Sequence, residues 1–380
     1  MNYKIAIYVQ HLLGAGHLVR AMSLAEALSE CGQQVLVLSG GFPIDRSIRG
    51  YQFYQLPPLR AIKGDFRRLV DERGHPVSEH WRNERVSQLL EEVRKFKPDL
   101  VITETFPFGR RQFLFELEPL LDWVQSQSSV RLMSSIRDIL QRRTEAKNRL
   151  SVEIIERYYD AVLVHADEAL FKLDASFPLS HEIQGKLIYT GYIHQAVEAL
   201  ASSPEKGNEV GQDEIIVSGG SGTVSTKLIE TARLARPLSS ASSRVWRLLT
   251  GRDKSGGAKT SEAGLIIEPN RQDFLAVLSR CVLSVSQAGY NTTLDVLASG
   301  ARSVMVPFSG DGETEQSDRA LALERAGRLV TLAEPDLTPQ SLALAIDRAL
   351  DMTPSIIPVN LNGAANSARL ISKKLDEWRA

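Results

Sequence analysis

Short apolar runs recur along this chain and alternate with longer segments whose apolar positions follow a helical period. The runs are rich in valine and isoleucine, which is typical of parallel strands buried on both faces of a sheet. They cover residues 4–10, 34–40, 99–105, 131–137, 160–166, 186–192, 214–220, 244–251, 264–269, 281–287 and 301–308. Helical segments such as 18–31 and 315–326 lie between them. The pattern predicts repeated βαβ units and an α/β fold with parallel sheets.

A break in this pattern predicts two domains, as does the length of 380 residues. Residues 201–214 are polar, contain glycine and proline and lack periodicity, so they are interpreted as a linker. The predicted domains are residues 1–200 and 215–362. One apolar stripe marks a helix in the tail, formed by Ala364, Ala368, Ile371, Leu375 and Trp378. We expect this helix, within residues 363–380, to cross back onto the first domain.

The composition excludes several classes of protein. A net charge of −1 and the absence of a basic tail give no reason to expect nucleic-acid binding. The chain enters a predicted strand at once and has no run of about 18 apolar residues, so we expect no signal peptide, no transmembrane segment and a cytoplasmic protein. Cys31 and Cys281 have no metal or redox spacing and are interpreted as buried small hydrophobes. Without an Asp-x-Asp motif or a His/Cys cluster, no metal cofactor is expected.

Residues 286–300, SQAGYNTTLDVLASG, carry candidate binding chemistry between a predicted strand and helix. Gly289 allows a sharp turn, and Asn291 and Thr292 are expected to cap the helix, whose first amides then face a ligand. Asp295, expected in the first helical turn, can accept hydrogen bonds from both hydroxyls of a ribose. These features suit a nucleotide, with an ordinary βα turn and a dipole-favoured acid as the alternative.

Two further loops of the second half fit the same ligand. The first can cradle a diphosphate with its backbone amides and comprises Gly219, Gly220, Ser221, Gly222 and Thr223. It lacks the lysine of a Walker A motif, and a simple tight turn is the alternative. In the acidic loop 309–319, Glu315 and Gln316 suit sugar hydroxyls, with a solvated acidic loop as the alternative.

In the first half, His17 is the candidate general base. It follows Gly14 and Gly16 and begins a predicted helix, whose N-terminus disfavours an imidazolium ion and keeps the ring neutral. A histidine that only caps or packs at the turn is the alternative. Asp138 and Glu104, which end strands on the same sheet edge, are the next candidates.

Other polar residues at this edge receive structural interpretations. His165 ends a strand and is interpreted as a structural histidine. Arg110 and Arg111 are interpreted as a solvated helix start, with contact to an acidic acceptor as the alternative. The segment 56–81 is expected to shape the acceptor side, and its arginines are candidates for contact with a membrane surface or an acidic acceptor.

With these motifs in hand, the chain resembles the GT-B glycosyltransferases, near the bacterial lipid II synthases. The G-A-G-H-L-V-R of residues 14–20 is similar to their N-terminal glycine loop, and Ser218–Thr223 to their GGS-G motif. The stretch Gly289–Asp295, which includes Tyr290, is similar to their G-x-N-S/T-x-x-E pattern. The chain is also similar to bacterial proteins described only as predicted glycosyltransferases, which share FPFGRRQF and SIRDIL.

The resemblance implies two facing Rossmann-like domains, a nucleotide-sugar donor on the C-terminal domain and an acceptor on the N-terminal domain. It places Asp295 on the ribose, Glu315 and Gln316 on the donor sugar, and His17 near the reacting carbon. Three residues depart from the family: Arg319 stands where members often have asparagine, Asp295 is one methylene shorter than the usual glutamate, and Gln195 stands where the synthase has arginine.

The function expected from the resemblance is metal-independent, inverting transfer of a sugar from a nucleotide-diphosphate donor to an unidentified acceptor. Two alternatives stay open. Nucleotide-sugar hydrolases of pseudaminic acid synthesis share the fold and a G-x-G-H-x-x-R opening, and their histidine activates water. A non-catalytic nucleotide-sugar binder would keep the amide loops but have no use for His17.

Overall fold

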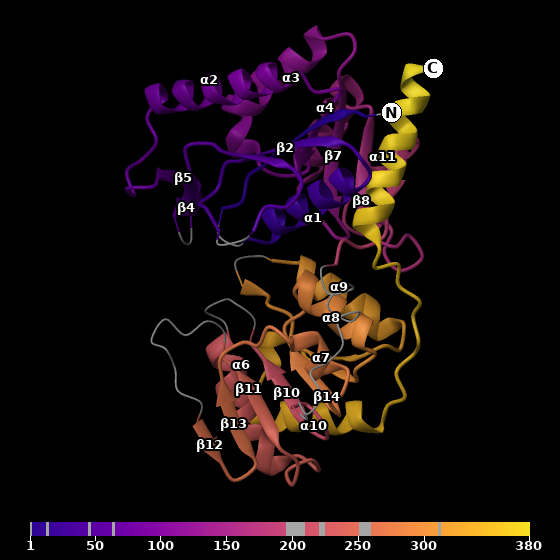
Figure 1. Ribbon diagram of the computed structural model, residues 1–380. Coiled ribbons are helices and arrows are strands. Elements are labelled where there is room, and N and C mark those ends of the chain that lie inside the picture. The colour runs from indigo at the N-terminus through magenta and orange to yellow at the C-terminus, as the bar shows by residue number, and fades with distance from the viewer. Residues whose placement is uncertain are drawn as a thin grey trace. The chain divides into compact units, whose positions relative to one another are not determined.

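A computed structural model of the chain describes residues 2–12, 15–44, 47–62, 65–194, 210–219, 225–250, 260–310 and 313–380. The chain divides into two compact units, Met1–Ile193 with Asn362–Ala380, and His194–Leu361 (Figure 1). The first unit ends before the expected boundary at residue 200. Residues 201–209 of the expected linker lie outside the described part of the chain.

The first unit is built on a seven-stranded parallel sheet in the order β3-β2-β1-β6-β7-β8-β9. Its strands are β1 (Lys4–Val9), β2 (Gln34–Ser39), β3 (Gln52–Gln55), β6 (Leu100–Glu104), β7 (Arg131–Arg137), β8 (Ala161–His165) and β9 (Leu187–Tyr189). Each apolar run predicted in this half contains one strand, which confirms the parallel α/β assignment. The edge strand β3 was not predicted, since its sequence QFYQ is half polar and its side chains are only half buried.

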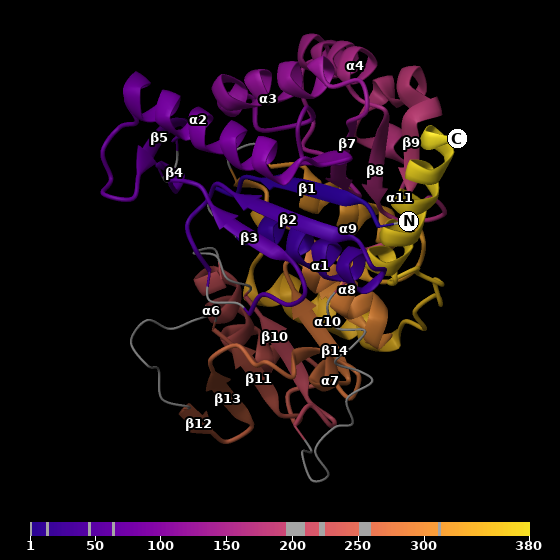
Figure 2. The same cartoon turned by 45° about the horizontal axis from the view of Figure 1, so that its top comes forward.

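Helices cover both faces of this sheet. Figure 2 shows α1 (Gly16–Glu30) and α11 (Gly363–Arg379) on one face, with α2 (Glu79–Phe96), α3 (Leu114–Ser126) and α4 (Glu145–Tyr158) on the other. Short 3₁₀ turns connect them at Arg111–Phe113, Leu173–Ala175 and Pro178–Lys186. Cys31, which follows α1, is exposed, so its interpretation as a buried hydrophobe was wrong.

The tail helix α11 returns to the first unit, as predicted. Ala368, Ile371 and Leu375 of the predicted stripe join the core formed by α1 and the first sheet (Figure 1, yellow). At its start, the backbone N–H of Gly363 donates to Tyr192 O at 2.9 Å. A Cβ on Gly363 would lie 2.4 Å from Gly191 O, so only glycine permits this close approach.

The second unit has its own seven-stranded sheet, in the order β12-β13-β11-β10-β14-β15-β16. The strands are β10 (Ile215–Ser218), β11 (Trp246–Leu249), β12 (Thr260–Glu262), β13 (Leu265–Glu268), β14 (Leu283–Ser286), β15 (Ser303–Met305) and β16 (Val330–Thr331). All neighbours are parallel except β12, which pairs antiparallel with β13. The short edge strands β12 and β16 were not predicted.

Five helices accompany this sheet in the described residues. They are α6 (Ser225–Ala235), α7 (Phe274–Leu278), α8 (Tyr290–Ser299), α9 (Glu315–Arg325) and α10 (Pro339–Asp351), with 3₁₀ turns at Arg236–Leu238 and Glu334–Asp336. A core of strand and helix side chains joins α6 and α10 to the sheet, including Trp246, Leu283 and Ile346, which are fully buried. Cys281 is partly buried, close to its expected environment.

The segment 56–81, expected to shape an acceptor side, contains a two-stranded antiparallel hairpin. Its strands are β4 (Leu59–Ile62) and β5 (Asp65–Asp71), and α2 follows directly. Ser78 caps α2 by accepting a hydrogen bond from the Trp81 backbone N–H at 3.2 Å.

A buried ion pair joins the two helices α2 and α3. Arg85 of α2 and Glu116 of α3 are both 0% exposed, and Arg85 Nε lies 2.6 Å from Glu116 Oε2. Tyr8 in β1 donates its hydroxyl to Glu116 Oε1 at 2.5 Å. Two buried charges are expensive unless paired and fully hydrogen-bonded, and this network meets that condition.

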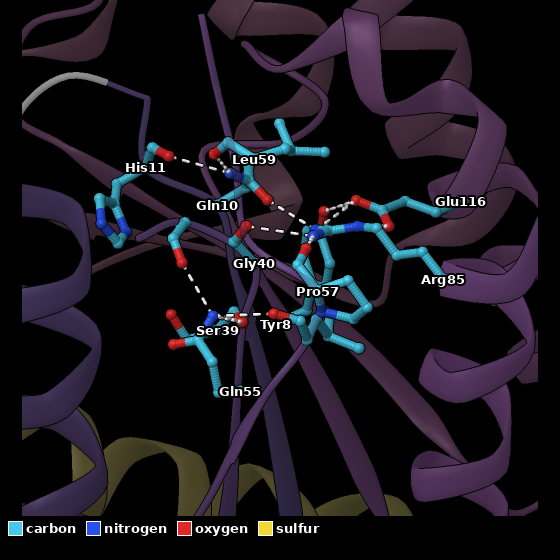
Figure 3. A network of polar contacts seen from close by, with 12 residues as sticks. Tyr8, Gln10, His11, Ser39, Gly40, Gln55, Pro57, Leu59, Arg85 and Glu116 are labelled. Atoms are coloured by element: carbon cyan, nitrogen blue, oxygen red, sulfur yellow. Dashed lines mark hydrogen bonds and ion pairs between the residues drawn. The ribbon is translucent and has the colours of Figure 1, made fainter. Parts of the chain in front are cut away.

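The same guanidinium also fixes three loops at the carboxyl edge of the first sheet. Arg85 donates to Gln10 Oε1 at 2.7 Å and to the carbonyl oxygens of Gly40 and Pro57 (Figure 3). A Cβ on Gly40 would lie 2.0 Å from Gln10 Oε1 and 2.1 Å from Arg85 Nη2, so this packing requires glycine. The loop that follows β1 therefore starts from a rigid anchor.

We predict that Arg85→Met lowers the free energy of unfolding by about 3–5 kcal/mol, because it leaves the Glu116 carboxylate buried without its cation. Urea denaturation followed by circular dichroism measures the change. Arg94→Met, on an exposed position of the same helix, is the control and should change stability by less than about 0.5 kcal/mol. Equal stability of the two variants would contradict the prediction.

Candidate active site

Polar side chains gather at the carboxyl edge of the first sheet, where ligands of open parallel sheets bind. Glu104 is the last residue of β6, Arg137 of β7 and His165 of β8. His17 is the second residue of α1, the helix that follows β1. Since β1, β6, β7 and β8 are neighbours in the sheet, these side chains come from adjacent strand ends.

His17 and Glu104 form a hydrogen-bonded pair. His17 Nδ1 lies 3.0 Å from Glu104 Oε1, and the side chains are 18% and 1% exposed. Arg20, one helical turn after His17, makes an ion pair with the same carboxylate oxygen. Thr105 Oγ1 lies 3.0 Å from His17 Nδ1. Sequence reasoning named Glu104 only as a substitute base and missed Arg20, although the three-residue spacing from His17 places both on one helix face.

The electrostatics of this pair fix its protonation. Burial favours the neutral carboxyl, but the charge of Arg20 and the hydrogen bond from His17 outweigh it and hold the pKa of Glu104 well below its usual value. Burial and the nearby charge of Arg110 lower the pKa of His17 to about 3. The sequence predicted a neutral His17 because of the helix N-terminus, whereas in the structure burial is the main cause of the lowered pKa. Ionised Glu104 only accepts hydrogen bonds, whereas Arg20, whose Nη2 lies 3.1 Å from His17 Nδ1, only donates them. We assign the proton of His17 to Nδ1, towards Glu104, and Nε2 is then the basic atom.

A chain of hydrogen bonds continues behind Glu104. Ser135 donates its hydroxyl to Glu104 Oε2 at 2.6 Å, and His165 Nε2 lies 3.0 Å from Ser135 Oγ. His165 Nδ1 lies 2.8 Å from Thr190 Oγ1. All four residues are at most 2% exposed, and burial lowers the pKa of His165 to about 3. A neutral His165 that donates from Nε2 to Ser135 leaves the Ser135 proton for Glu104, so this histidine supports the carboxylate from behind. The Thr190 hydroxyl, beside Nδ1, also lies 2.9 Å from Gly191 O.

The other predicted residues of the first unit fall as follows. Asp138, the second predicted catalytic residue, is 1% exposed, and His17 has no hydrogen bond with it. Gly16 begins α1, whereas Gly14 lies outside the described residues. Arg110 is half-buried and donates from Nε to Gln10 O at 2.8 Å, so its interpretation as part of a solvated helix start was wrong.

In the second unit, the predicted turn after β14 is present, but its details differ. Gly289 is the N-cap of α8, and no side chain caps the helix, so the predicted capping by Asn291 and Thr292 was wrong. Both residues lie in the first helical turn after Tyr290, and Asp295 lies in the second turn instead of the first. A helix start without a side-chain cap is the kind of position at which proteins bind anions.

Asp295 has a partner that sequence reasoning missed. His194 Nε2 lies 2.8 Å from Asp295 Oδ1, and the two side chains are 4% and 18% exposed. The residues are 101 positions apart in the chain, so their spacing carries no signal. One carboxylate oxygen of Asp295 is therefore already bound, and the other is the candidate for a ligand hydroxyl.

Arg319, noted above as a departure from the family pattern, organises the same loop. It donates from Nη1 to Ala288 O at 2.9 Å and from Nη2 to Glu315 Oε1 at 2.8 Å. Glu315 is 4% exposed, and Gln316 Oε1 accepts from the Phe308 backbone N–H at 3.2 Å. Both predicted sugar-binding side chains are thus engaged within the protein.

The glycine loop of this unit is described only at its start. Gly219, which follows β10, donates its backbone N–H to Leu249 O at 3.3 Å. Gly220, Ser221, Gly222 and Thr223 lie outside the described residues. The part of the chain that the structure describes contains no group of three His, Cys, Asp or Glu residues able to hold a metal ion. None of its helices combines the length and apolarity needed to span a bilayer.

Comparison with known sequences supports the resemblance drawn above. Residues 215–375 match the glycosyltransferase family 28 C-terminal domain. The chain is similar to the UDP-N-acetylglucosamine--N-acetylmuramyl-(pentapeptide) pyrophosphoryl-undecaprenol N-acetylglucosamine transferase of Methylibium petroleiphilum, with 29% identity over 235 residues, 56% of this chain and 61% of the relative. The same enzyme of Rhodospirillum centenum is 26% identical over 57% of this chain and 61% of the relative. The chain thus matches about three fifths of the length of these two relatives.

Solved structures match over nearly the whole chain. MurG of Acinetobacter baumannii has a TM-score of 0.62 at 15% identity and covers 97% of this chain and 99% of its own. The glycotransferase of kitacinnamycin has a TM-score of 0.65 at 15% identity, with 99% and 100% covered. The fold is that of the GT-B glycosyltransferases, which confirms the fold expected from the sequence.

We predict that the two neutral histidines make the stability of the first unit depend on pH. Each histidine has a folded-state pKa of about 3, compared with 6.5 in the unfolded chain. Between these pH values the unfolded chain binds one more proton per histidine than the folded protein does. Stability should therefore fall as the pH drops from 6.5 towards 3, by up to about 1.4 kcal/mol per pH unit for each histidine.

His165→Gln should remove one of these protons, so the slope of unfolding free energy between about pH 6 and pH 5 should fall by about 1.4 kcal/mol per pH unit. Denaturant titrations at a series of pH values measure this slope. His181, whose side chain is 70% exposed, is the control, and His181→Gln should keep the wild-type slope. An unchanged slope in His165→Gln would mean that His165 is charged in the folded protein.

Proposed function

We propose that this protein is an inverting glycosyltransferase that moves a sugar from a nucleoside-diphosphate donor to a hydroxyl of an acceptor without a metal ion. The family 28 domain at residues 215–375 supports the donor class. The observation that carries the catalytic assignment is the hydrogen bond of 3.0 Å between His17 Nδ1 and Glu104 Oε1. It leaves Nε2 of a neutral imidazole as the base.

The proposed step is a direct displacement at the anomeric carbon, with His17 as the general base. Nε2 of His17 takes the proton of the acceptor hydroxyl, whose oxygen bonds to the anomeric carbon as the bond to the diphosphate oxygen breaks. The imidazolium ion that forms lies beside the ionised Glu104, which stabilises it. A base opposite the leaving group gives inversion. A protein that only binds nucleotide sugars would have no use for this buried pair.

The second unit supports donor binding through its backbone. The start of α8, which has no side-chain cap, suits the diphosphate, whose charge its amides would stabilise without a metal ion. The glycine-rich sequence of residues 219–223 is assigned to the same group from its composition alone. We assign Asp295 to the ribose, through the carboxylate oxygen that His194 does not bind. Glu315 and Gln316 would reach the donor sugar only by giving up their present partners. The Methylibium petroleiphilum relative is named for a UDP-sugar donor and an acceptor linked through pyrophosphate to undecaprenol. By analogy, contact with a membrane surface is part of the proposal.

Asp295→Ala should weaken binding of UDP or a UDP-sugar by about 1.5–3 kcal/mol, the range for a hydrogen bond to a charged group. Calorimetry in EDTA measures the affinity and tests the absence of a metal requirement at the same time. Asp351→Ala, at an exposed position ending α10, is the control. Unchanged affinity in Asp295→Ala would remove this residue from the site, and binding that needs added magnesium or manganese would contradict the metal-free donor site.

His17→Ala should lower kcat by about 10²–10⁴-fold while donor affinity stays near that of the wild type. Glu104→Gln should also lower kcat, because it removes the charge that stabilises the imidazolium ion. A mass-spectrometric screen of nucleotide sugars, with and without hydroxyl acceptors, measures turnover, and His181→Ala is the control. Near-normal turnover in His17→Ala, or a product with retained anomeric configuration, would reject the mechanism. Sugar release without any acceptor would identify a hydrolase instead.

A further inference from the structure

Arg110 is a cation of the first unit that the proposed reaction does not yet use. Its side chain is half-buried, and Nε donates to Gln10 O at 2.8 Å. Within the described ranges it forms no ion pair with a carboxylate. Its backbone has a φ of 64°, a left-handed conformation that costs free energy for any residue with a Cβ.

The surroundings of Arg110 are electrostatically unfavourable for a cation. Burial and the charge of Arg137 lower the pKa of Arg110 to about 10, and Arg20 acts in the same direction. Glu104 acts in the opposite direction, but Arg20 already occupies this carboxylate in an ion pair. A guanidinium held in such a place is well suited to bind an oxyanion, since a bidentate hydrogen bond would restore the missing charge balance.

We propose that Arg110 binds an anionic group of the acceptor, a carboxylate or a phosphate, close to the hydroxyl that receives the sugar. The inference rests on the proposed function, because it assigns the acceptor to the edge that carries His17. The position supports it: Gln10, which Arg110 contacts, directly follows β1, and β6 beside it ends in Glu104.

Binding at Arg110 would also activate the base. The charged groups acting on His17 are Glu104 from β6, Arg20 from α1 and Arg110 from the loop after β6. Burial is the largest cause of the lowered pKa of His17, and the charge of Arg110 is the second largest. An anion on Arg110 cancels that charge and raises the basicity of Nε2. The base then becomes effective when an acceptor is bound and stays weak towards water, which favours transfer over hydrolysis.

Inorganic phosphate is the probe that tests this site. Calorimetry should show phosphate binding to the wild type, at least tenfold weaker binding to Arg110→Gln, and retained binding to Arg110→Lys. Arg111→Gln is the matched control, because the neighbouring Arg111 donates to Lys147 O and Ser151 Oγ, away from His17. Equal phosphate affinity in the wild type and Arg110→Gln, or no binding to the wild type, would overturn the proposal. Near-UV circular dichroism verifies that each variant is folded.

Two further measurements separate the acceptor from the donor and from the proposed function. The pKa of His17, followed by NMR, should rise on adding phosphate to the wild type and stay constant in Arg110→Gln. The affinity for UDP should be the same in both proteins, and a tenfold loss in Arg110→Gln would mean that the site serves the donor diphosphate instead. If UDP binds neither protein, the proposed function fails, whereas the phosphate results still decide whether Arg110 is an anion site.

Discussion

The structure of the proposed reaction centre depends on one buried carboxylate. Glu104 is 1% exposed, yet it stays ionised because Arg20 pairs with it and Ser135 and His17 donate to it. An ionised carboxylate only accepts hydrogen bonds, so it orients the hydroxyl of Ser135 towards itself and accepts the Nδ1 proton that we assign to His17. Through Ser135 it also fixes the ring of His165. A neutral Glu104 would leave the tautomers of both histidines undetermined.

The first unit contains a second buried carboxylate, Glu116. Comparing its network with that of Glu104 shows how a structural network differs from a candidate catalytic one. Glu116 is satisfied by Arg85 and Tyr8, and Arg85 binds carbonyl oxygens on three loops. Among the described residues, no imidazole ring bonds Glu116 or Arg85, and both of these charges are 0% exposed. Around Glu104, by contrast, a titratable ring with 18% exposure contacts the carboxylate. The Glu116 network makes the edge rigid, whereas the Glu104 network can move a proton.

The sequence predicts the parts of this molecule that follow from local pattern. Strands buried on both faces appear as apolar runs, and the stripe of α11 follows a helical period, so both were found. The edge strands β3, β12 and β16 lack that pattern because one side meets solvent or their length is too short. The contacts that define the site are non-local: His17 and Glu104 are 87 residues apart, and His194 and Asp295 are 101. No spacing rule joins such residues, so the strand ends could be predicted but not the pairs among them.

The start of α8 and the surroundings of Arg110 show a second limit, which is energetic. Asn291 and Thr292 are good capping residues, but the turn places Gly289 at the N-cap, so no side chain caps the helix. Arg110 looks like a solvated residue because arginines at helix starts usually are, but the fold half-buries it and bonds its Nε to Gln10 O. In both places the geometry of the fold, and not the residue type, decides the environment. Under the proposed function, the negative charge at each place would arrive with a substrate, and a residue type that local rules assign to capping or to solvent would serve binding instead.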